Sequence, residues 1–364
     1  MALSWIAVNA LTGSVMADLP FLRVDGPLKR TLMRYESQTA SLPMGDPNDE
    51  DDPTRPPENW RQATRKGASF LVALDENETP LWGGLVVRRN TNEGPDVQFS
   101  LASAEAYFDR VFVGSVQFEE IPQNQIVKTL IEWYAAANQG GIPIRVQIVG
   151  GDGQPRSQSY SDLDDETLYS ALTGLSGLLG GPEWTVGWEW VGDQKLGLVA
   201  TVGDRVGSTA PEGLEPAAQF YLPGNVSTFE LDEGYGNGEG ANDVQATASE
   251  ARSPRQVSAN DGRPRFEHRF SPDAEAETFD DLVAHSERGL AAMKDGTVAL
   301  KLTLNRHEPP FLGVDWNLGD DIGFDLTAPA WPEGITGTAR AVGWELDDDT
   351  VTPLIEVKGI EGLD

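Results

Sequence analysis

The chain has 364 residues, enough for two or three domains, and 39% of them are hydrophobic, so it can bury substantial cores. Its 58 acidic and 27 basic residues give a formal net charge of −31, and such a surface repels nucleic-acid phosphates instead of binding them. The absence of cysteine excludes disulfides, thiolate catalysis and zinc–thiolate sites. No stretch of the sequence is long and apolar enough to predict a membrane span.

Residues 1–118 are predicted to be rich in β-structure. The N-terminus lacks the basic segment of a signal peptide, and Ile6–Ala10 with Ser14–Ala17 is expected to form a hairpin. A long polar excursion follows, and the acidic, proline-rich loop Met44–Asn59 at its centre is expected to be exposed. Regular strands of one sheet then resume at Ser69–Leu74, Leu81–Arg89, Val97–Leu101 and Val111–Phe118.

Residues 119–216 change to an α+β pattern. Apolar residues recur at helical spacing in Ile126–Ala137 and again in Thr167–Leu179, which ends at a Gly-Gly-Pro sequence. Ile142–Val149 is predicted to be a strand. Trp184–Trp190 and Lys195–Thr201 are predicted to form a hairpin around Gly192-Asp193.

The remaining residues return to β-structure with one helix. Thr278–Met293 is the predicted helix, with Thr278 as its N-cap and Asp281 completing a weak capping box. Predicted strands are Val226–Leu231, Val244–Ser249, Phe266–Phe270, Val298–Leu304, Ile322–Leu326, Thr338–Trp344 and Val351–Val357.

Three patterns resemble ligand sites, and each has a simpler interpretation. Acidic and amide side chains alternate as in a calcium-binding loop at Asp46, Asn48, Glu50 and Asp52, but prolines interrupt the run and no Glu closes it, so a solvated loop is favoured. Gly174–Gly181 has glycines spaced faintly as in a phosphate-binding loop, yet it lies within and after a helix. The three histidines, His268, His285 and His307, lack metal-binding spacing.

The aromatic residues around Trp184, Trp188 and Trp190 allow two interpretations. Trp188 and Trp190 share one face of a predicted strand, where they would form a platform for stacking carbohydrate. Packing in a core or between subunits is favoured. Because no nucleophile motif is present and no carboxylate pair is singled out, the sequence predicts that the protein is not an enzyme and has no catalytic residue, cofactor or metal.

Several stretches, in this order along the chain, resemble one known family: LWGGLVVRR (81–89), SAEAYFDRVFV (103–113), residues 220–249, residues 278–305, FLGVDWNLGDDIGFDL (311–326) and residues 340–357. They resemble the minor tail proteins of long-tailed, siphovirus-type phages of actinobacteria, and are similar to the tail-tip hub and the N-terminal hub part of tail-associated lysins.

The resemblance implies a mainly β fold with an α+β connecting layer, in which one chain holds two tail-tube-like β-barrels. The first barrel would be residues 1–118, the second 217–262 plus 307–364, and the connecting domain 119–216 plus 263–306. The implied function is that of a structural hub subunit in the virion tail tip, made in the host cytoplasm. A homotrimeric ring with pseudo-sixfold symmetry would join the tail tube to tip or fibre proteins. Its neighbours would include the distal tail and tape-measure proteins, and DNA would pass through without specific binding.

A ring that passes DNA should repel its phosphates, and residues 228–249 are acidic and contain no Lys or Arg. We expect that the channel is lined by Glu230, Asp232, Glu233, Glu239 and Asp243, and that none of them has a pairing partner. Solvated decoration is the competing interpretation. Two other functions remain open: a carbohydrate-binding adhesin of the same particle, which needs an exposed aromatic cleft, and a polysaccharide-acting enzyme, which needs two carboxylates in a groove.

Overall fold

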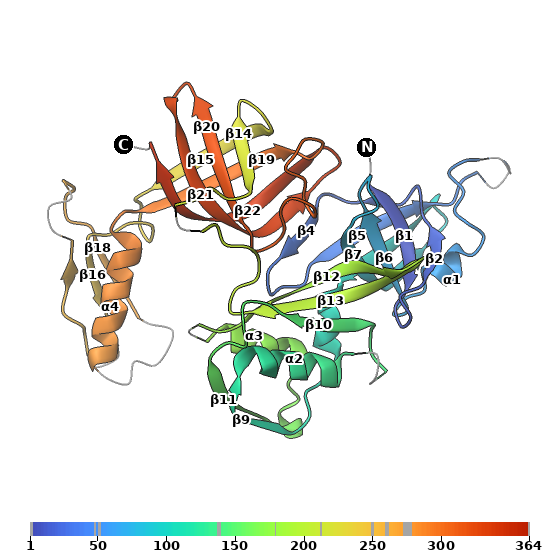
Figure 1. The fold of residues 1–364 in the computed structure, drawn as a ribbon, viewed down its shortest axis with the longest axis horizontal. Coiled ribbons are helices and arrows are strands. Elements are labelled where there is room, and N and C mark those ends of the chain that lie inside the picture. The colour runs from blue at the N-terminus through green and yellow to red at the C-terminus, as the bar shows by residue number, and fades with distance from the viewer. Residues whose placement is uncertain are drawn as a thin grey trace. The chain divides into compact units, whose positions relative to one another are not determined.

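The computed structural model describes residues 3–46, 49, 52–136, 140–178, 180–211, 213–248, 251–258, 262–271 and 279–362 (Figure 1). The chain divides into two compact units, the larger formed by Met1–Thr228 with Thr303–Asp364 and the smaller by Phe229–Leu302. The fold is mainly β, as predicted. Among the described residues, no helix has the length and apolar character needed to cross a membrane.

The first sheet of the larger unit has seven strands and is antiparallel. In spatial order these are β2 (Val15–Asp18), β1 (Ser4–Asn9), β6 (Ser69–Leu74), β7 (Pro80–Thr91), β8 (Asp96–Ser103), β5 (Ser37–Pro43) and β3 (Arg23–Val24). Every residue of β6 is buried, because Phe70, Val72 and Leu74 face the connecting part while Leu71 and Ala73 pack on the opposite side. A four-residue helix, α1 (Trp60–Ala63), precedes β6.

Two predictions for residues 1–118 are wrong. The polar excursion contains strands β3, β4 (Leu28–Thr31) and β5, which the sequence pattern missed because β5 buries only Ala40 and Leu42. The predicted strand Val111–Phe118 does not continue the sheet. It follows a 3₁₀-helix, Ala104–Arg110, and its last three residues begin β9 (Val116–Pro122), which pairs with β11 (Pro155–Tyr160) in a separate ribbon.

The connecting part packs two helices against a three-stranded sheet, as expected for 119–216. Its helices are α2 (Gln123–Tyr134) and α3 (Leu168–Ser176), and its sheet has the order β10 (Ile144–Ile148), β13 (Lys195–Gly203) and β12 (Glu183–Gly192). Thr167 caps α3, since its hydroxyl oxygen accepts a hydrogen bond of 3.1 Å from the Ser170 N–H. The predicted helix ends at Ala137 and Leu179 lie outside the described residues.

The second sheet includes a strand from the N-terminal segment, and two of its strands, Val226–Gly234 and Thr297–Asn305, contain residues of both units. Its order is β14 (Ala218–Leu222), β20 (Asp321–Ala328), β21 (Trp331–Leu346), β22 (Thr350–Glu361), β19 (Thr297–Asn305) and β15 (Val226–Gly234). β4 adds to β21, with Leu28 opposite Leu346. Trp82 of β7 connects the first sheet to β4 as well, because its indole N–H donates a 3.0 Å hydrogen bond to the Lys29 carbonyl.

The smaller unit contains a three-stranded sheet covered by one helix. The strands lie in the order β17 (Gln256–Val257), β16 (Asp243–Ala246) and β18 (Glu267–Phe270), and α4 (Phe279–Met293) packs on β16. This grouping differs from the sequence prediction, which assigned 263–306 to the connecting domain and 217–262 to the second barrel. The apolar face of a helix predicts that it packs on a sheet, not which one. The predicted cap Thr278 and the side chain of Asp281 lie outside the described residues.

Candidate functional site

Four of the five carboxylates predicted to line a channel are exposed. Glu230, Asp232 and Glu233 lie on β15, where Glu230 and Asp232 share one face and Glu233 points to the other. Glu239 lies in the following turn and accepts a hydrogen bond of 2.9 Å from the Gly236 N–H. Their position in a channel remains a prediction, because it depends on an assembly of several copies.

Asp243 is different, and the expectation that it has no partner is wrong. Its side chain is 4% exposed and lies 3.0 Å from Nη1 of Arg255 and 2.6 Å from Nε of Arg265. Parallel pairing of β16 with β18 places Glu267 directly opposite Asp243, so the same arginines also reach Glu267. No local pattern could have predicted these ion pairs, because the register between the two strands decides them.

In the acidic loop Met44–Asn59, the Asp52 carboxylate stabilises a turn by accepting hydrogen bonds from nearby residues. Asp52 accepts hydrogen bonds from the Asp46 N–H at 2.6 Å and from both the N–H and the hydroxyl of Thr54 at 2.8 Å. These donors, the Asp46 N–H first among them, hold the pKa of the Asp52 carboxyl below its ordinary value. Asn48 and Glu50 lie outside the described residues, and the described part of the chain has no cluster of His, Asp and Glu able to hold a metal.

The structure gives each histidine a separate environment. His268 stacks on Phe270, with ring centroids 5.8 Å apart. His307 places Nε2 3.4 Å from the Asp349 carboxylate, and His285 is half-buried on α4. These contacts agree with the interpretation of all three as ordinary surface or core residues.

The tryptophans of β12 pack against the first sheet and helices. Trp184 is fully buried between Phe108 and Tyr169, and Trp188 meets Phe70 edge-on with a centroid separation of 5.0 Å. Trp190 is 38% exposed, and its indole N–H donates a 2.8 Å hydrogen bond to the Glu78 carbonyl. Packing is therefore the role that these contacts support, and they do not form the flat exposed platform that a carbohydrate-binding adhesin needs.

The contact between Trp188 and the first sheet requires a glycine. A Cβ atom on Gly83 would lie 2.5 Å from Cε2 of the Trp188 ring. We expect Gly83→Ala to lower the free energy of unfolding by about 1–3 kcal/mol in urea denaturation, because the ring has to move. Gly187→Ala is the matched control on β12, since nothing lies within 4 Å of a Cβ there. Equal losses from both variants, or no rescue of Gly83→Ala by Trp188→Leu, would contradict this prediction.

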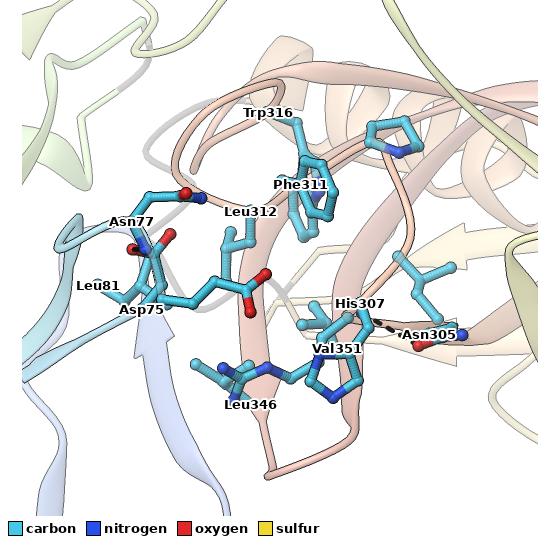
Figure 2. A pocket seen from close by; sticks show the side chains of 14 residues that line it. Asp75, Asn77, Leu81, Asn305, His307, Phe311, Leu312, Trp316, Leu346 and Val351 are labelled. Carbon is cyan, nitrogen blue, oxygen red and sulfur yellow. Dashed lines mark hydrogen bonds between the residues drawn. The ribbon is translucent and has the colours of Figure 1, made fainter. Parts of the chain in front are cut away.

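A small cavity lies between the β6–β7 turn and the second sheet (Figure 2). Its volume is about 40 Å³, and Asp75, Asn77, His307, Phe311 and Trp316 are among the residues that line it. Burial lowers the pKa of Arg306 at this cavity, although Asp348, Glu76, Asp75 and Asp349 act in the opposite direction. A small-molecule site has a volume of about 300 Å³ or more. The cavity therefore has room for a few water molecules and not for a substrate.

Two larger hollows are open depressions on sheet faces. One, of about 510 Å³, lies on the second sheet and includes Gln219, Tyr221, Asp325 and Lys358. The other, of about 420 Å³, lies on the first sheet and includes Tyr35, Leu85, Val87, Asp109 and Arg110.

Ion pairs that include the buried Asp321 carboxylate tie the connecting part to the second sheet. Asp321 of β20 lies 2.6 Å from both Arg205 and Lys358, and it also accepts a 3.0 Å hydrogen bond from the Ala210 N–H. Arg340 of β21 pairs with Glu183 of β12. The Asp321 carboxylate is 2% exposed, so moving the two layers apart would leave a buried charge without its partner Arg205, and the ion pair thereby fixes the position of one layer on the next.

Known proteins resemble this chain in structure, but the sequence comparisons found no match. No model of a known protein family matches the sequence, and no curated protein matches it. A 43 kDa tail protein of prophage MuSo2 from Shewanella oneidensis is 13% identical, with a TM-score of 0.59 over 97% of each chain. A tail protein from Neisseria meningitidis is 14% identical, with a TM-score of 0.54 over 97% of this chain and 96% of its own.

The chain has the fold of these tail proteins. A chain of the PdpA–VgrG complex of Francisella is also similar, at 8% identity and a TM-score of 0.52, but the match covers 98% of this chain and 58% of that one. Both tail proteins match along nearly their whole length, so the two sheets and the connecting part occur together in one known architecture. The resemblance to phage tail proteins drawn from the sequence is thereby confirmed for the fold.

Proposed function

We propose that this chain is a structural subunit of a phage tail, namely a hub of the tail tip in a long-tailed phage of actinobacteria. Three copies form a closed ring, and because each chain contributes two tube-like sheets, the ring has pseudo-sixfold symmetry. It joins the tail tube to tip or fibre proteins, beside the distal tail and tape-measure proteins, and DNA passes through it without specific binding.

The observation that carries this proposal is the pair of seven-stranded sheets within one chain that matches tail proteins end to end. An open sheet has edge strands whose backbone groups need protection or a partner. Asn225 protects β14, because its side-chain oxygen accepts from the Tyr221 N–H at 2.8 Å and its nitrogen donates to the Gln219 carbonyl at 3.2 Å. β15 lies at the other end of the sheet and, among the described residues, pairs only with β19, which supports a contact between copies there.

Electron microscopy of the virion and of the purified chain tests the proposal. We expect a closed ring that contains three copies at the tail tip. The neighbouring rings can supply part of the assembly energy, so the isolated chain is expected to form the ring only at high protein concentration. A particle with one isolated copy, or with six identical copies, would be incompatible with this stoichiometry.

A further inference from the structure

The three-stranded sheet of the smaller unit has one covered face and one charged face. Val244 and Phe270 point toward α4, where Gly289 allows the helix to approach them closely. Because side chains alternate along a strand, Asp243 on β16 and Glu267 and Arg269 on β18 point the opposite way.

Three arginines are held in place on the charged face: Arg255, Arg265 and Arg269, which we call the arginine face. The buried Asp243 carboxylate holds Arg255 at 3.0 Å and Arg265 at 2.6 Å. The Glu267 carboxylate forms ion pairs with all three, at 2.9 Å from Arg265, 3.2 Å from Arg255 and 3.3 Å from Arg269. The arginine side chains nevertheless remain 36%, 54% and 46% exposed in residue order.

This arrangement leaves hydrogen-bonding capacity for a further anion. Each guanidinium has five N–H donors, and among the described residues these three guanidiniums share two carboxylates. Guanidiniums already fixed by a buried carboxylate lose little side-chain entropy when they bind another one. The face is therefore suited to carboxylates, which it binds through charge-assisted hydrogen bonds.

The same unit also carries the complementary surface. Glu230, Asp232 and Glu233, which we call the acidic strip, are exposed on β15, in a stretch with no Lys or Arg between Thr228 and Ser249. The strip and the arginine face belong to different sheets of the chain. Two unlike, complementary patches on one chain are what a head-to-tail contact requires, and such contacts form a ring when the rotation between neighbouring copies closes.

We propose that the arginine face of one copy binds the acidic strip of the neighbouring copy, so that the partner is a second copy of this chain. The proposal rests on the ring proposed above and identifies one contact that closes it. A chain with a net charge of −31 repels its own copies, so opposite charges at the contact offset that repulsion and select the register in which copies meet.

Sedimentation velocity of charge-reversed variants tests this contact. Arg269→Glu changes the one arginine of this face that pairs with Glu267 and not with Asp243, so both ion pairs of Asp243 stay in place. Glu230→Lys with Asp232→Lys reverses the acidic strip. We expect each of these variants to raise the dissociation constant of self-association by about tenfold or more, and the combined variant to return it to near the wild-type value. Added salt should weaken the wild-type association.

Arg288→Glu and Glu287→Lys are the matched controls, because both residues are exposed on α4 of the same unit, and neither should change association. Circular dichroism verifies that every variant is folded. If wild-type rings form and the reversals have no effect, or if the combined variant fails to restore association, this contact is wrong while the ring stands. If wild-type chains stay monomeric at every concentration and microscopy of virions shows no ring, both proposals are wrong.

Discussion

Replacing Asp321 by Ala is expected to lower the free energy of unfolding by about 1.5–3 kcal/mol, measured by urea denaturation at neutral pH, because the hydrogen bonds of a buried carboxylate are lost while the two cations left behind are partly exposed. The carboxylate is 2% exposed and holds Arg205 and Lys358, each at 2.6 Å. Its removal leaves two cations without their partner at the junction of the connecting part and the second sheet. Asp325→Ala, at an exposed position of the same strand, should change stability by less than about 0.5 kcal/mol.

The effect of Asp321→Ala should depend on pH in a defined direction. Burial alone would raise the pKa of the Asp321 carboxyl, but hydrogen bonds from Arg205, Lys358 and the Ala210 N–H outweigh it and lower the pKa. A carboxyl with a lowered pKa stabilises the fold above its unfolded-state pKa of about 3.9, and this contribution is lost as the pH falls through the folded value. The difference between wild type and variant should therefore shrink below about pH 4. A difference that grows in acid would contradict this assignment.

Trp184→Ala is expected to cost about 3–5 kcal/mol of unfolding free energy, because it leaves a cavity in the core shared by the first sheet and the connecting part. Trp184 is fully buried and packs on Phe108 and Tyr169 at centroid separations of 5.9 and 6.0 Å. Its indole nitrogen has no hydrogen-bond partner among the described residues, so Trp184→Phe should lose clearly less.

Thermal and urea denaturation of these variants can be compared with Trp133→Ala as the control. Trp133 is 52% exposed on α2, and its removal should change stability by less than about 0.5 kcal/mol. If Trp184→Ala and Trp133→Ala were equally mild, the connecting part would not share a core with the first sheet. A loss confined to Trp184→Ala supports a single cooperative core across the two layers.

Elements with a strong local pattern were predictable from the sequence. Ser69–Leu74 is a run of apolar and small residues between turns, and it is β6 with the predicted bounds. The apolar face of α2 and the hairpin of β12 and β13 also agree with prediction, because short-range periodicity and turn residues determine them. The acidic strip was identified from composition alone, since a stretch without Lys or Arg needs no fold to be recognised.

Residues 1–118 show where local patterns were insufficient. β4 is a polar four-residue strand, LKRT, and it forms because β21 of the second sheet, more than 300 residues later, offers a free backbone edge. Val111–Phe118 looks like a strand of the first sheet, yet its apolar side chains Val113 and Phe118 are buried in the core shared with the helices. In both cases long-range packing outweighs local propensity.

The sequence by itself therefore determined the β-rich character, most of the strands and helices, and the strongly acidic surface. Only the tertiary structure decided which sheet each strand joins, that α4 covers β16, and that Asp243 is buried between Arg255 and Arg265. The physical reason is that strand registers and ion pairs depend on residues far apart in the chain. Their energies arise once the backbone has brought those residues together, and no short segment carries that information.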